Sequence, residues 1–513
     1  MKTPPPTNPK RKRGPLDAAP AIAFGACPLP ALDPRFSRRA FLERNALGLG
    51  GVALACLLGE GGLLAREPAK PIEEHITDLR PRQPHFAPRA KAMISLFMQG
   101  GPSQVDLMDP KPELTRLHDT NYEREVEFSG VSRASRKLFA SPWKFAKHGQ
   151  CGTEVSELLP YTAGIVDDLC VIRSMKAQIN NHDMRYFFGG IPNVPGRPSL
   201  GAWMLYGLGC ESQDLPAYVV LSDPASLPVD EAQNWSAGFM PPIFQGTLLR
   251  TQEPRIVNLD PPARLRGLPQ QQNMALLAEL NRRHLDSHPG EADLEARIAS
   301  YELAARMQSA AKEALDVSTE SEATQKLYGI DQPATKDFGT RCLIARRLVE
   351  RGVRFVQLFL NYQAWDHHTN IRAVLPPVCL RADQPSAALV QDLKARGLLD
   401  TTVVHWGGEI GRLPVMEAEG DPAKAGRDHN GQGFSMWLAG GGFRSGMTFG
   451  ATDEVGHHAV ENIVTVNDFQ ATLLHQFGLD HQRLVFHHNG REQSLTAGRP
   501  ARVVNEIIQT AGV

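Results

Sequence analysis

The sequence predicts an α/β fold in which helices flank a central, mostly parallel β-sheet. Two observations support this prediction. Short apolar runs rich in β-branched and aromatic residues alternate with longer stretches in which apolar residues recur at helical spacing. Polar clusters also stand at the ends of several of these runs, as expected where ligands bind at the carboxyl edge of a parallel sheet.

Five apolar runs are interpreted as strands of this sheet. They cover residues 92–98, 169–174, 354–360, 401–406 and 434–439. Helical spacing predicts helices over 336–352 and 384–397, and Gly397 provides a stop for the second. Residues 276–315 are charged and helix-patterned, so we expect a helical insertion at the rim of the fold.

Charge is distributed unevenly along the chain. Residues 1–66 carry ten Lys and Arg against four Asp and Glu, while the remainder carries 45 against 52, a net charge of −7. A domain of that sign is a poor nucleic-acid binder, so no nucleic-acid partner is expected. The sequence therefore divides into a leader region, 1–66, and a single domain, 67–513.

The leader has the features of a twin-arginine export signal. The run Ser37-Arg38-Arg39-Ala40-Phe41-Leu42 matches the export pattern, and the uncharged segment Asn45–Gly59 follows it. That segment is too short for a bilayer span, which needs roughly 20 residues, so the mature chain is expected to have no stable membrane span. Export to the periplasm or cell surface is the prediction. An amphipathic surface helix with a solvated basic tail is the alternative.

Carboxylates and imidazoles gather around the last three predicted strands. Asp366 and His368 follow the third strand, Glu409 follows the fourth, and Asp428 and His429 precede the fifth. Divalent cations bind Asp oxygen and His nitrogen together, so the pattern predicts a metal site. The last pair alone would be interpreted as a turn cap with a surface imidazole. Its combination with the other three residues favours a shared ligand cluster.

Other polar residues near strand ends are further candidates. Asp106 follows the first strand after a glycine-rich turn. Arg412 either binds an anionic substrate oxygen or pairs with the glutamate three residues before it. Ser174, at the end of the second strand, is a candidate nucleophile or closes a turn. His182 and His457 are loop histidines with weaker claims to the site.

Several phrases carry a family resemblance, among them GGPSQVDLMDPKP, WDHHTN, GGEIGRLP and GRDHNGQGFSMWLAGGG. They resemble the exported, sulfatase-like proteins of domain-of-unknown-function family 1501, over residues 35–510. The resemblance implies an alkaline-phosphatase-like fold, with a mostly parallel sheet flanked by helices and metals at its carboxyl edge. It also implies a divalent metal cofactor, with Zn²⁺, Ca²⁺ and Mn²⁺ as the candidates.

The resemblance also implies individual ligands. His429 resembles the late histidine ligand of alkaline phosphatases, and Asp366 with His368 resembles their earlier ligand group. Where those enzymes have an Asp-His pair, this chain has Glu409, which would substitute as an oxygen ligand. Asp106 is the nearest replacement for their first-strand aspartate.

The expected function is that of an exported, metal-dependent hydrolase of phosphate or sulfate esters, acting on a small molecule or a glycan. Formylglycine sulfatases need a CxPxR or SxPxR motif, which this sequence does not contain, so that chemistry is not expected. The alternative is a non-catalytic exported binding protein that keeps the fold and part of the metal site.

Overall fold

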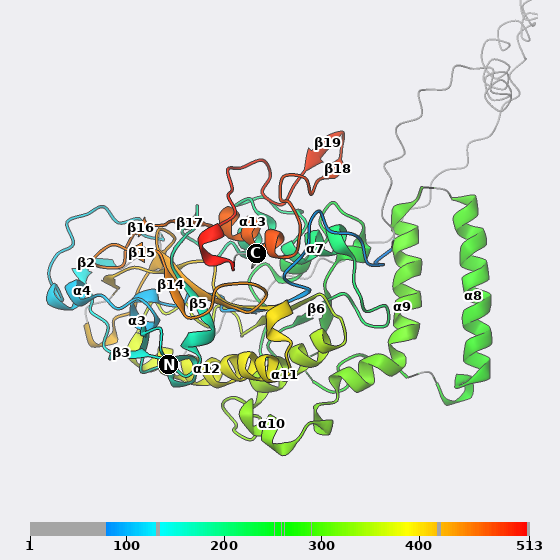
Figure 1. The fold of residues 1–513 in the computed structure, drawn as a ribbon, viewed down its shortest axis with the longest axis horizontal. Coiled ribbons are helices and arrows are strands. Elements are labelled where there is room, and N and C mark those ends of the chain that lie inside the picture. The colour runs from blue at the N-terminus through cyan, green and yellow to red at the C-terminus, as the bar shows by residue number, and fades with distance from the viewer. Residues whose placement is uncertain are drawn as a thin grey trace, which may run out of the picture. The chain divides into compact units, whose positions relative to one another are not determined.

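The computed structural model describes residues 78–509, apart from 130–133, 251, 258, 261, 289 and 418–421. The leader expected at 1–66 lies outside the described residues. In the described part, a sheet lies between two sets of helices (Figure 1). None of its helices is both long enough and apolar enough to cross a membrane.

One sheet of nine strands forms within the described residues, in the order β14, β5, β13, β9, β1, β8, β6, β7, with β17 also paired to β5. The strands are β1 Ala92–Phe97, β5 Leu169–Lys176, β6 Tyr218–Leu221, β7 Thr247–Leu249, β8 Phe355–Phe359, β9 Thr402–Gly407, β13 Phe434–Ala439, β14 Met447–Phe449 and β17 Val464–Thr465. Neighbouring strands pair in parallel, except that β13 is antiparallel to both β5 and β9. The expected mostly parallel sheet is confirmed.

The central strands are apolar because both faces of the sheet are covered. Every residue of β1, β8, β9 and β13 is buried, as expected for strands that lie between two helical layers. In β1, Ile94 and Leu96 belong to the core on one face, whereas Met93 and Phe97 belong to the core on the other. This alternation is the period of a strand.

Helices on the two faces come from different parts of the chain. One face is covered by α11 (Lys336–Glu350) and α12 (Ile371–Ala395), and the other by α6 (Met184–Gly189), α7 (Leu200–Leu208) and α13 (Val466–Gln476). The helix expected over 336–352 is confirmed as α11. The helix expected over 384–397 begins earlier than predicted, since α12 continues through three internal prolines.

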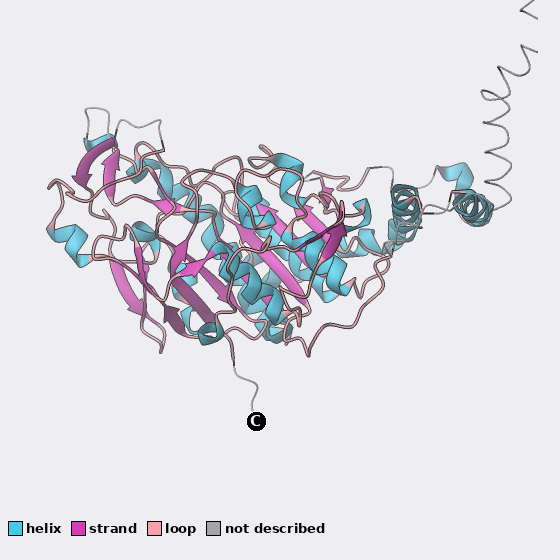
Figure 2. Cartoon of the chain, turned by 90° about the horizontal axis from the view of Figure 1, so that it is seen from above, coloured by secondary structure: helices cyan, strands magenta, loops and turns pink. Residues whose placement is uncertain are grey.

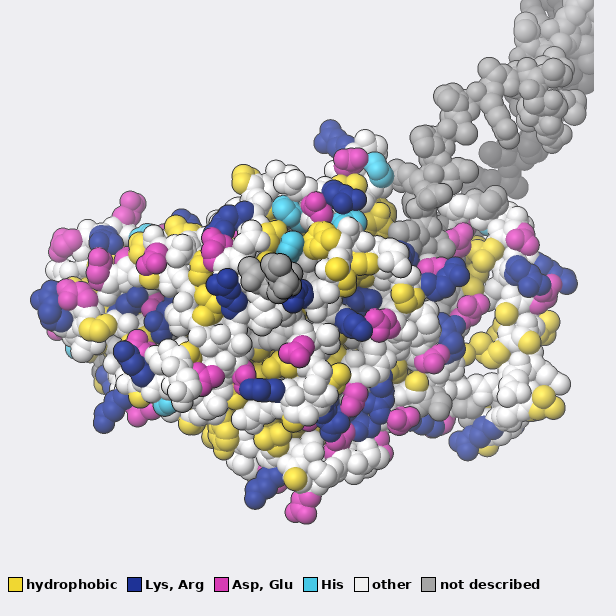
Figure 3. Space-filling view, viewed as in Figure 1, with side chains coloured by type: hydrophobic (Ala, Val, Ile, Leu, Met, Phe, Trp, Pro, Cys, Tyr) yellow, Lys and Arg dark blue, Asp and Glu magenta, His cyan; other side chains and the backbone are white. Residues whose placement is uncertain are grey.

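The expected helical insertion is a hairpin of two helices, α8 (Leu268–Ser287) and α9 (Ala292–Leu315), at one end of the domain (Figures 1 and 2). No residue of α8 is buried. Ala311, Ala314 and Leu315 of α9 pack into the core, which anchors the hairpin. Apolar side chains remain visible along the hairpin in Figure 3, and Leu276 and Tyr301 are 59% and 66% exposed.

Small two-stranded ribbons and short helices lie outside the main sheet. The ribbons are β10 (Gly411–Arg412) with β12 (His429–Asn430), β11 (Val415–Glu417) with β2 (Ala134–Leu138), β3 (Phe145–His148) with β4 (Thr153–Ser156), β15 (Ala451–Thr452) with β16 (Ala459–Glu461), and β18 (Phe486–His488) with β19 (Arg491–Gln493). The short helices are α3 (Gln104–Leu107), α4 (Pro112–Arg116), α5 (Pro160–Ala163) and α10 (Glu322–Leu327). The first two ribbons position side chains of the candidate site.

Candidate metal centre

The candidate residues meet at one edge of the sheet. Asp366 and His368 lie beyond the carboxyl end of β8, Glu409 beyond that of β9, and His182 beyond that of β5. His429 precedes β13 in sequence, but β13 runs opposite to its neighbours and therefore starts at this same edge. Because β13 runs in the opposite direction, His429, which precedes its strand, lies beside residues that follow theirs.

The carboxylate of Asp366 is the centre of the cluster. Its Oδ1 lies 2.9 Å from His368 Nε2 and 3.3 Å from His429 Nε2, and its Oδ2 lies 3.3 Å from His182 Nε2. The Nε2 atoms of His368 and His429 are 3.2 Å apart. The convergence of Asp366, His368 and His429 expected from the sequence is present in the structure. His182, which had only a weak claim, joins them.

Two of the imidazoles are held from behind by carboxylates. His182 Nδ1 is 2.7 Å from Glu409 Oε1, and His368 Nδ1 is 2.7 Å from Glu417 Oε2. A carboxylate only accepts hydrogen bonds when ionised, so each Nδ1–H donates and each Nε2 faces Asp366. Glu409, expected as an oxygen ligand, therefore contacts the cluster through the ring of His182.

His429 is positioned by the β10–β12 ribbon. Arg412 and His429 are directly paired across this ribbon. The backbone N–H of His429 donates to Asp428 Oδ1 at 2.7 Å, and His429 Nδ1 lies 3.2 Å from the carbonyl oxygen of Asn180. Asp428 Oδ1 is also 3.8 Å from His368 Nδ1, and its Oδ2 accepts the backbone N–H of Ser129. The predicted ligand Asp428 has metal-ligand spacing to His368 and His429.

Arg412 is buried and its guanidinium makes four hydrogen bonds. It donates to the carbonyl oxygens of Gly100, Gly101 and Arg427, and to Asp366 Oδ1 at 2.5 Å. Its carboxylate partner is thus Asp366 rather than the glutamate three residues before it. The side chain has no exposed surface with which to contact a substrate anion, so it positions Asp366 instead.

Asp106 forms a closed ion pair away from the three imidazoles. Arg427 Nε and Nη2 donate to its two oxygens at 2.7 Å and 3.0 Å, and Ser103 Oγ donates to Oδ2 at 2.6 Å. Both side chains of the pair are completely buried. This geometry differs from the ligand role expected for Asp106, because its oxygens are already bonded to a guanidinium and a hydroxyl.

Ser174 lies outside the cluster. Its side chain is buried in β5, and its hydroxyl donates to the carbonyl oxygen of Asn462 at 2.7 Å. That is the hydrogen bond of a residue that secures a neighbouring loop. The structure does not bring the candidate nucleophile to Asp366 or the histidines.

Burial disfavours every charge in the cluster, and the neighbouring groups decide the direction of each pKa. Burial would raise the pKa of Asp366, but the adjacent guanidinium and the close contacts from the histidines hold it far below its usual value. Burial would lower the pKa of His368, but Asp366 and Glu417 raise it to about 9. Burial lowers the pKa of His429. Without a bound cation, the carboxylate of Asp366 is ionised and the ring of His368 is a positively charged imidazolium at neutral pH.

Formal charge in the cluster is unbalanced. Four carboxylates, those of Asp366, Glu409, Glu417 and Asp428, lie with side chains at most 15% exposed beside one guanidinium, that of Arg412. Buried carboxylates need a compensating charge, which protonated histidines or a bound cation would supply.

Two buried atoms in the described part of the cluster have no hydrogen-bond partner. They are Nε2 of His182 and Oε2 of Glu409, on side chains that are 8% and 3% exposed. His182 Nε2 points at Asp366 without making a hydrogen bond to it. Two sets of three residues have ligand atoms that all lie within 4.8 Å of one another: His182, Asp366 and His429, and His368, Asp428 and His429. Each spacing is compatible with a bound ion, and His429 belongs to both sets.

Sequence reasoning undervalued His182 and missed Glu417. His182 follows the second predicted strand, so its position at a strand end was the available signal. Glu417 reaches His368 from the β2–β11 ribbon, and no local pattern marks it.

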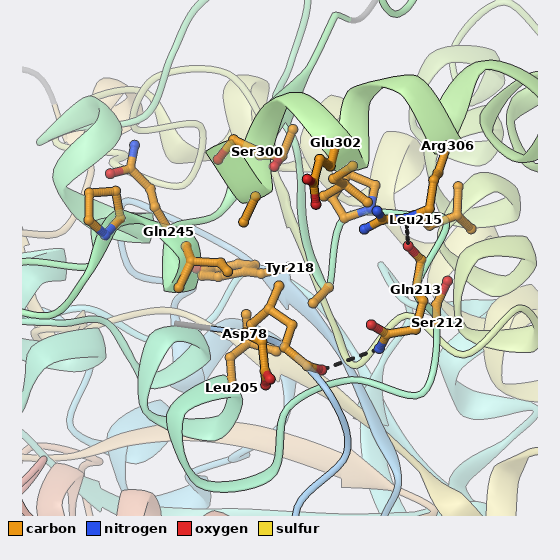
Figure 4. A pocket seen from close by; sticks show the side chains of 18 of the residues that line it. Asp78, Leu205, Ser212, Gln213, Leu215, Tyr218, Gln245, Ser300, Glu302 and Arg306 are labelled. Carbon is orange, nitrogen blue, oxygen red and sulfur yellow. Dashed lines mark hydrogen bonds between the residues drawn. The ribbon is translucent and has the colours of Figure 1, made fainter. Parts of the chain in front are cut away.

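A cavity of about 500 Å³ lies at the other edge of the sheet, between α9 and the start of β6. Figure 4 shows Tyr218 among the side chains that line it, and the hydrogen bond from Arg306 to the carbonyl oxygen of Gln213. None of the described groups with metal-ligand spacing lines it. The cavity is therefore separate from the candidate centre.

Comparisons with solved structures find distant likenesses. One is the PsFucS1 sulfatase from Pseudoalteromonas sp., at 12% identity over 76% of this chain and 68% of that one, with a TM-score of 0.33. Another is the lipoteichoic acid synthase LtaP from Listeria monocytogenes, at 10% identity over 80% of this chain and 77% of that one, with a TM-score of 0.29. Likenesses at this level carry no argument about activity.

No curated protein matches the chain. A family model does match, and it covers the whole sheet and every residue of the candidate centre. That model is described as Protein of unknown function (DUF1501), it matches residues 90–508, and the chain belongs to this family.

Proposed function

We propose that the protein is a metal-dependent hydrolase of phosphate or sulfate esters. The observation that carries the proposal is the meeting of three imidazole Nε2 atoms at one carboxylate, Asp366, on the carboxyl edge of the sheet. Three nitrogens and one oxygen suit Zn²⁺ better than Ca²⁺ or Mn²⁺, which prefer oxygen ligands. The excess of carboxylates over guanidinium in the cluster supports a divalent cation there.

A cation held by these residues would polarise the ester oxygen, neutralise charge on the leaving oxygen and lower the pKa of water. Asp366, fixed by Arg412, and the three histidines would hold it. Side chains of His368 and Asp366 are 27% and 15% exposed, against 8% for His182 and for His429. We infer that the ester approaches from the His368 side.

Water is the proposed nucleophile. No hydroxyl or thiol side chain among the described residues is hydrogen-bonded to Asp366, His182, His368 or His429. Water would add to phosphorus or sulfur, the bond to the ester oxygen would break, and the leaving alcohol would take up a proton.

Metal content and turnover on one preparation test this function. Protein purified after Zn²⁺ or Mn²⁺ supplementation should contain stoichiometric ion and hydrolyse an aryl phosphate, an aryl sulfate or a phosphodiester. His429→Ala should lose both ion and activity, because ligand loss removes the cation. His487→Ala is the matched control, since that imidazole is 58% exposed and outside the cluster. Wild-type protein without ion and without turnover would refute the hydrolase.

A binding protein is the second candidate. Arg412, the arginine at the cluster, donates hydrogen bonds to three carbonyl oxygens and to Asp366. Its guanidinium is therefore not available to bind an anionic ester. A non-catalytic exported protein that binds a glycan or a partner without cleaving it fits this observation. Ion bound stoichiometrically, with glycan binding and no turnover on any ester, would favour it.

We also propose export through the twin-arginine pathway, as the sequence of residues 37–59 predicts. Changing Arg38 and Arg39 together to Lys should trap the precursor inside the cell, which fractionation and immunoblotting would detect. Efficient export of the double variant would contradict the pathway.

A further inference from the structure

The two glutamates behind His182 and His368 make the same contact. Glu409 Oε1 accepts the Nδ1–H of His182, and Glu417 Oε2 accepts that of His368, both at 2.7 Å. In each case the opposite ring nitrogen, Nε2, faces Asp366. The ring therefore separates each glutamate from the position where a cation would lie.

Each glutamate is fixed by a glycine that allows a close backbone approach. The N–H of Gly100 donates to Glu409 Oε1 at 2.9 Å. Gly100 has φ +105°, and a Cβ there would lie 2.6 Å from the backbone nitrogen of Asp366. Any other residue would be strained and would displace the loop that carries Asp366. The geometry behind His182 is thus built into the turn after β1.

Glu417 is fixed from the other side of the cluster. Its backbone exchanges hydrogen bonds with Gly426, at 3.0 Å and 2.8 Å. A Cβ on Gly426 would overlap the backbone of His368, so glycine lets β11 lie against the loop that carries this histidine. Glu417 is buried and its side chain is 8% exposed.

We propose that Glu409 and Glu417 are positioning residues of the metal centre, which hold His182 and His368 with hydrogen on Nδ1 so that both Nε2 atoms bind the ion beside Asp366. The inference rests on the proposed metal site and revises the expectation that Glu409 is itself a ligand. A carboxylate on Nδ1 fixes the tautomer and ring orientation and makes Nε2 a stronger donor. It also explains why Glu409 Oε2 is buried without a partner, since a cation on the ring would balance its charge.

The experiment replaces each glutamate by its uncharged isostere in the full chain. Glu409→Gln and Glu417→Gln should each weaken Zn²⁺ affinity about 10- to 100-fold, measured by chelator competition, while saturation still gives the wild-type stoichiometry. Glu492→Gln is the matched control, because Glu492 also lies near a histidine, at 3.9 Å from His487, but is 66% exposed. Its Zn²⁺ affinity should equal that of the wild type.

The Co²⁺ absorption spectrum separates positioning from ligation. If the glutamates act through the imidazoles, Co²⁺-loaded variants should keep the band intensity of the wild-type coordination, with only a small shift. A changed coordination number or halved stoichiometry in Glu409→Gln would make Glu409 a ligand and overturn the proposal. Wild-type affinity in both variants would also overturn it. Thermal unfolding of each ion-free variant checks that the fold is intact.

Failure of the proposed function gives a different pattern. If the wild-type protein binds neither Zn²⁺ nor Co²⁺, there is no metal centre, and the positioning role of the two glutamates is refuted as well. If the wild-type protein binds the ion but cleaves no ester, only the hydrolase function is refuted, and the positioning role of the two glutamates is unaffected.

Discussion

Two Asp–Arg pairs lie at the same edge of the sheet and differ in exposure and in what else contacts the carboxylate. Asp106 and Arg427 are both completely buried, and the two carboxylate oxygens are taken up by guanidinium and a hydroxyl. Asp366 also pairs with an arginine, Arg412, but three imidazoles share its carboxylate and its side chain is 15% exposed. We call the Asp106–Arg427 pair saturated, because both oxygens of its carboxylate already accept hydrogen bonds from a guanidinium and a hydroxyl. We call the Asp366–Arg412 pair unsaturated, because the imidazoles around its carboxylate could bind an ion instead. The comparison teaches that a saturated pair stabilises the fold, whereas an unsaturated pair can take part in ligand binding.

The largest expected effect is at the unsaturated pair. Asp366→Asn keeps the side-chain shape but removes the charge that the three Nε2 atoms face. We expect loss of stoichiometric Zn²⁺ or Mn²⁺ binding, measured by elemental analysis after gel filtration, with the fold retained. Asp119→Asn, at an exposed aspartate, should bind the ion normally. Retention of the ion by Asp366→Asn would break the comparison.

The saturated pair should respond in stability instead. Asp106→Asn leaves Arg427 buried without a charged partner, so the free energy of unfolding should fall by about 3–5 kcal/mol in urea titrations. The folded fraction should still bind the ion stoichiometrically. The surface pair of Asp119 with Lys137 provides the control, where Asp119→Asn should cost about 1 kcal/mol or less. Loss of the ion in folded Asp106→Asn would instead assign Asp106 to the centre.

Histidines with and without a carboxylate partner differ in the same way: contact with two carboxylates raises the pKa of His368, whereas His405 has no such partner. His405 lies in the core beside Ser95 with no carboxylate, and burial lowers its pKa to about 3. The folded state therefore binds fewer protons than the unfolded state between that pKa and about 6.5, so stability falls as pH falls through this window. At about pH 5 the loss from His405 is about 2 kcal/mol. His405→Gln should reduce the fall in unfolding free energy between about pH 7 and pH 5 by this amount.

The same measurement contains its own check. His457, whose pKa burial lowers to about 4, is unchanged in His405→Gln, so some acid sensitivity should remain. A variant as acid-sensitive as the wild type would show that His405 is not held neutral in the folded state.

The smallest expected effect is at Ser174. Ser174→Ala removes one hydrogen bond to the carbonyl oxygen of Asn462, which should cost about 1 kcal/mol of stability. Because the hydroxyl lies outside the cluster, kcat on any ester substrate should not change. A large loss of kcat with ion content preserved would restore Ser174 as a nucleophile.

Much of the fold could be predicted because the strands that carry the site are buried on both faces. β1, β8, β9 and β13 are predominantly apolar runs, which local pattern identifies well. The start of α12 was missed because Pro376, Pro377 and Pro385 indicate a break, yet the helix continues through them. Packing of α12 against the sheet outweighs that local preference.

The site was predicted in part. Asp366, His368 and His429 stand beside strands in dense polar runs, so their local sequence marks them. In an all-parallel sheet, however, His429 would lie at the wrong edge, because it precedes its strand. Only the antiparallel direction of β13 corrects this, and no residue of β13 encodes that direction on its own. Glu417 could not be predicted, since its contact with His368 depends on a ribbon formed by distant segments.

The reversed strand also sets the time at which the centre can be completed. β13 inserts between β5 and β9, and β1 pairs with β8, which follows it by about 260 residues. Pairings this distant in sequence form slowly. During synthesis, the ribosome must release the chain through Ala439 before β13 can bring His429 to Asp366. A shorter nascent chain has most of the sheet but lacks the contact of His429 with Asp366, so an ion held at the proposed centre would be loaded only after nearly the whole domain is translated.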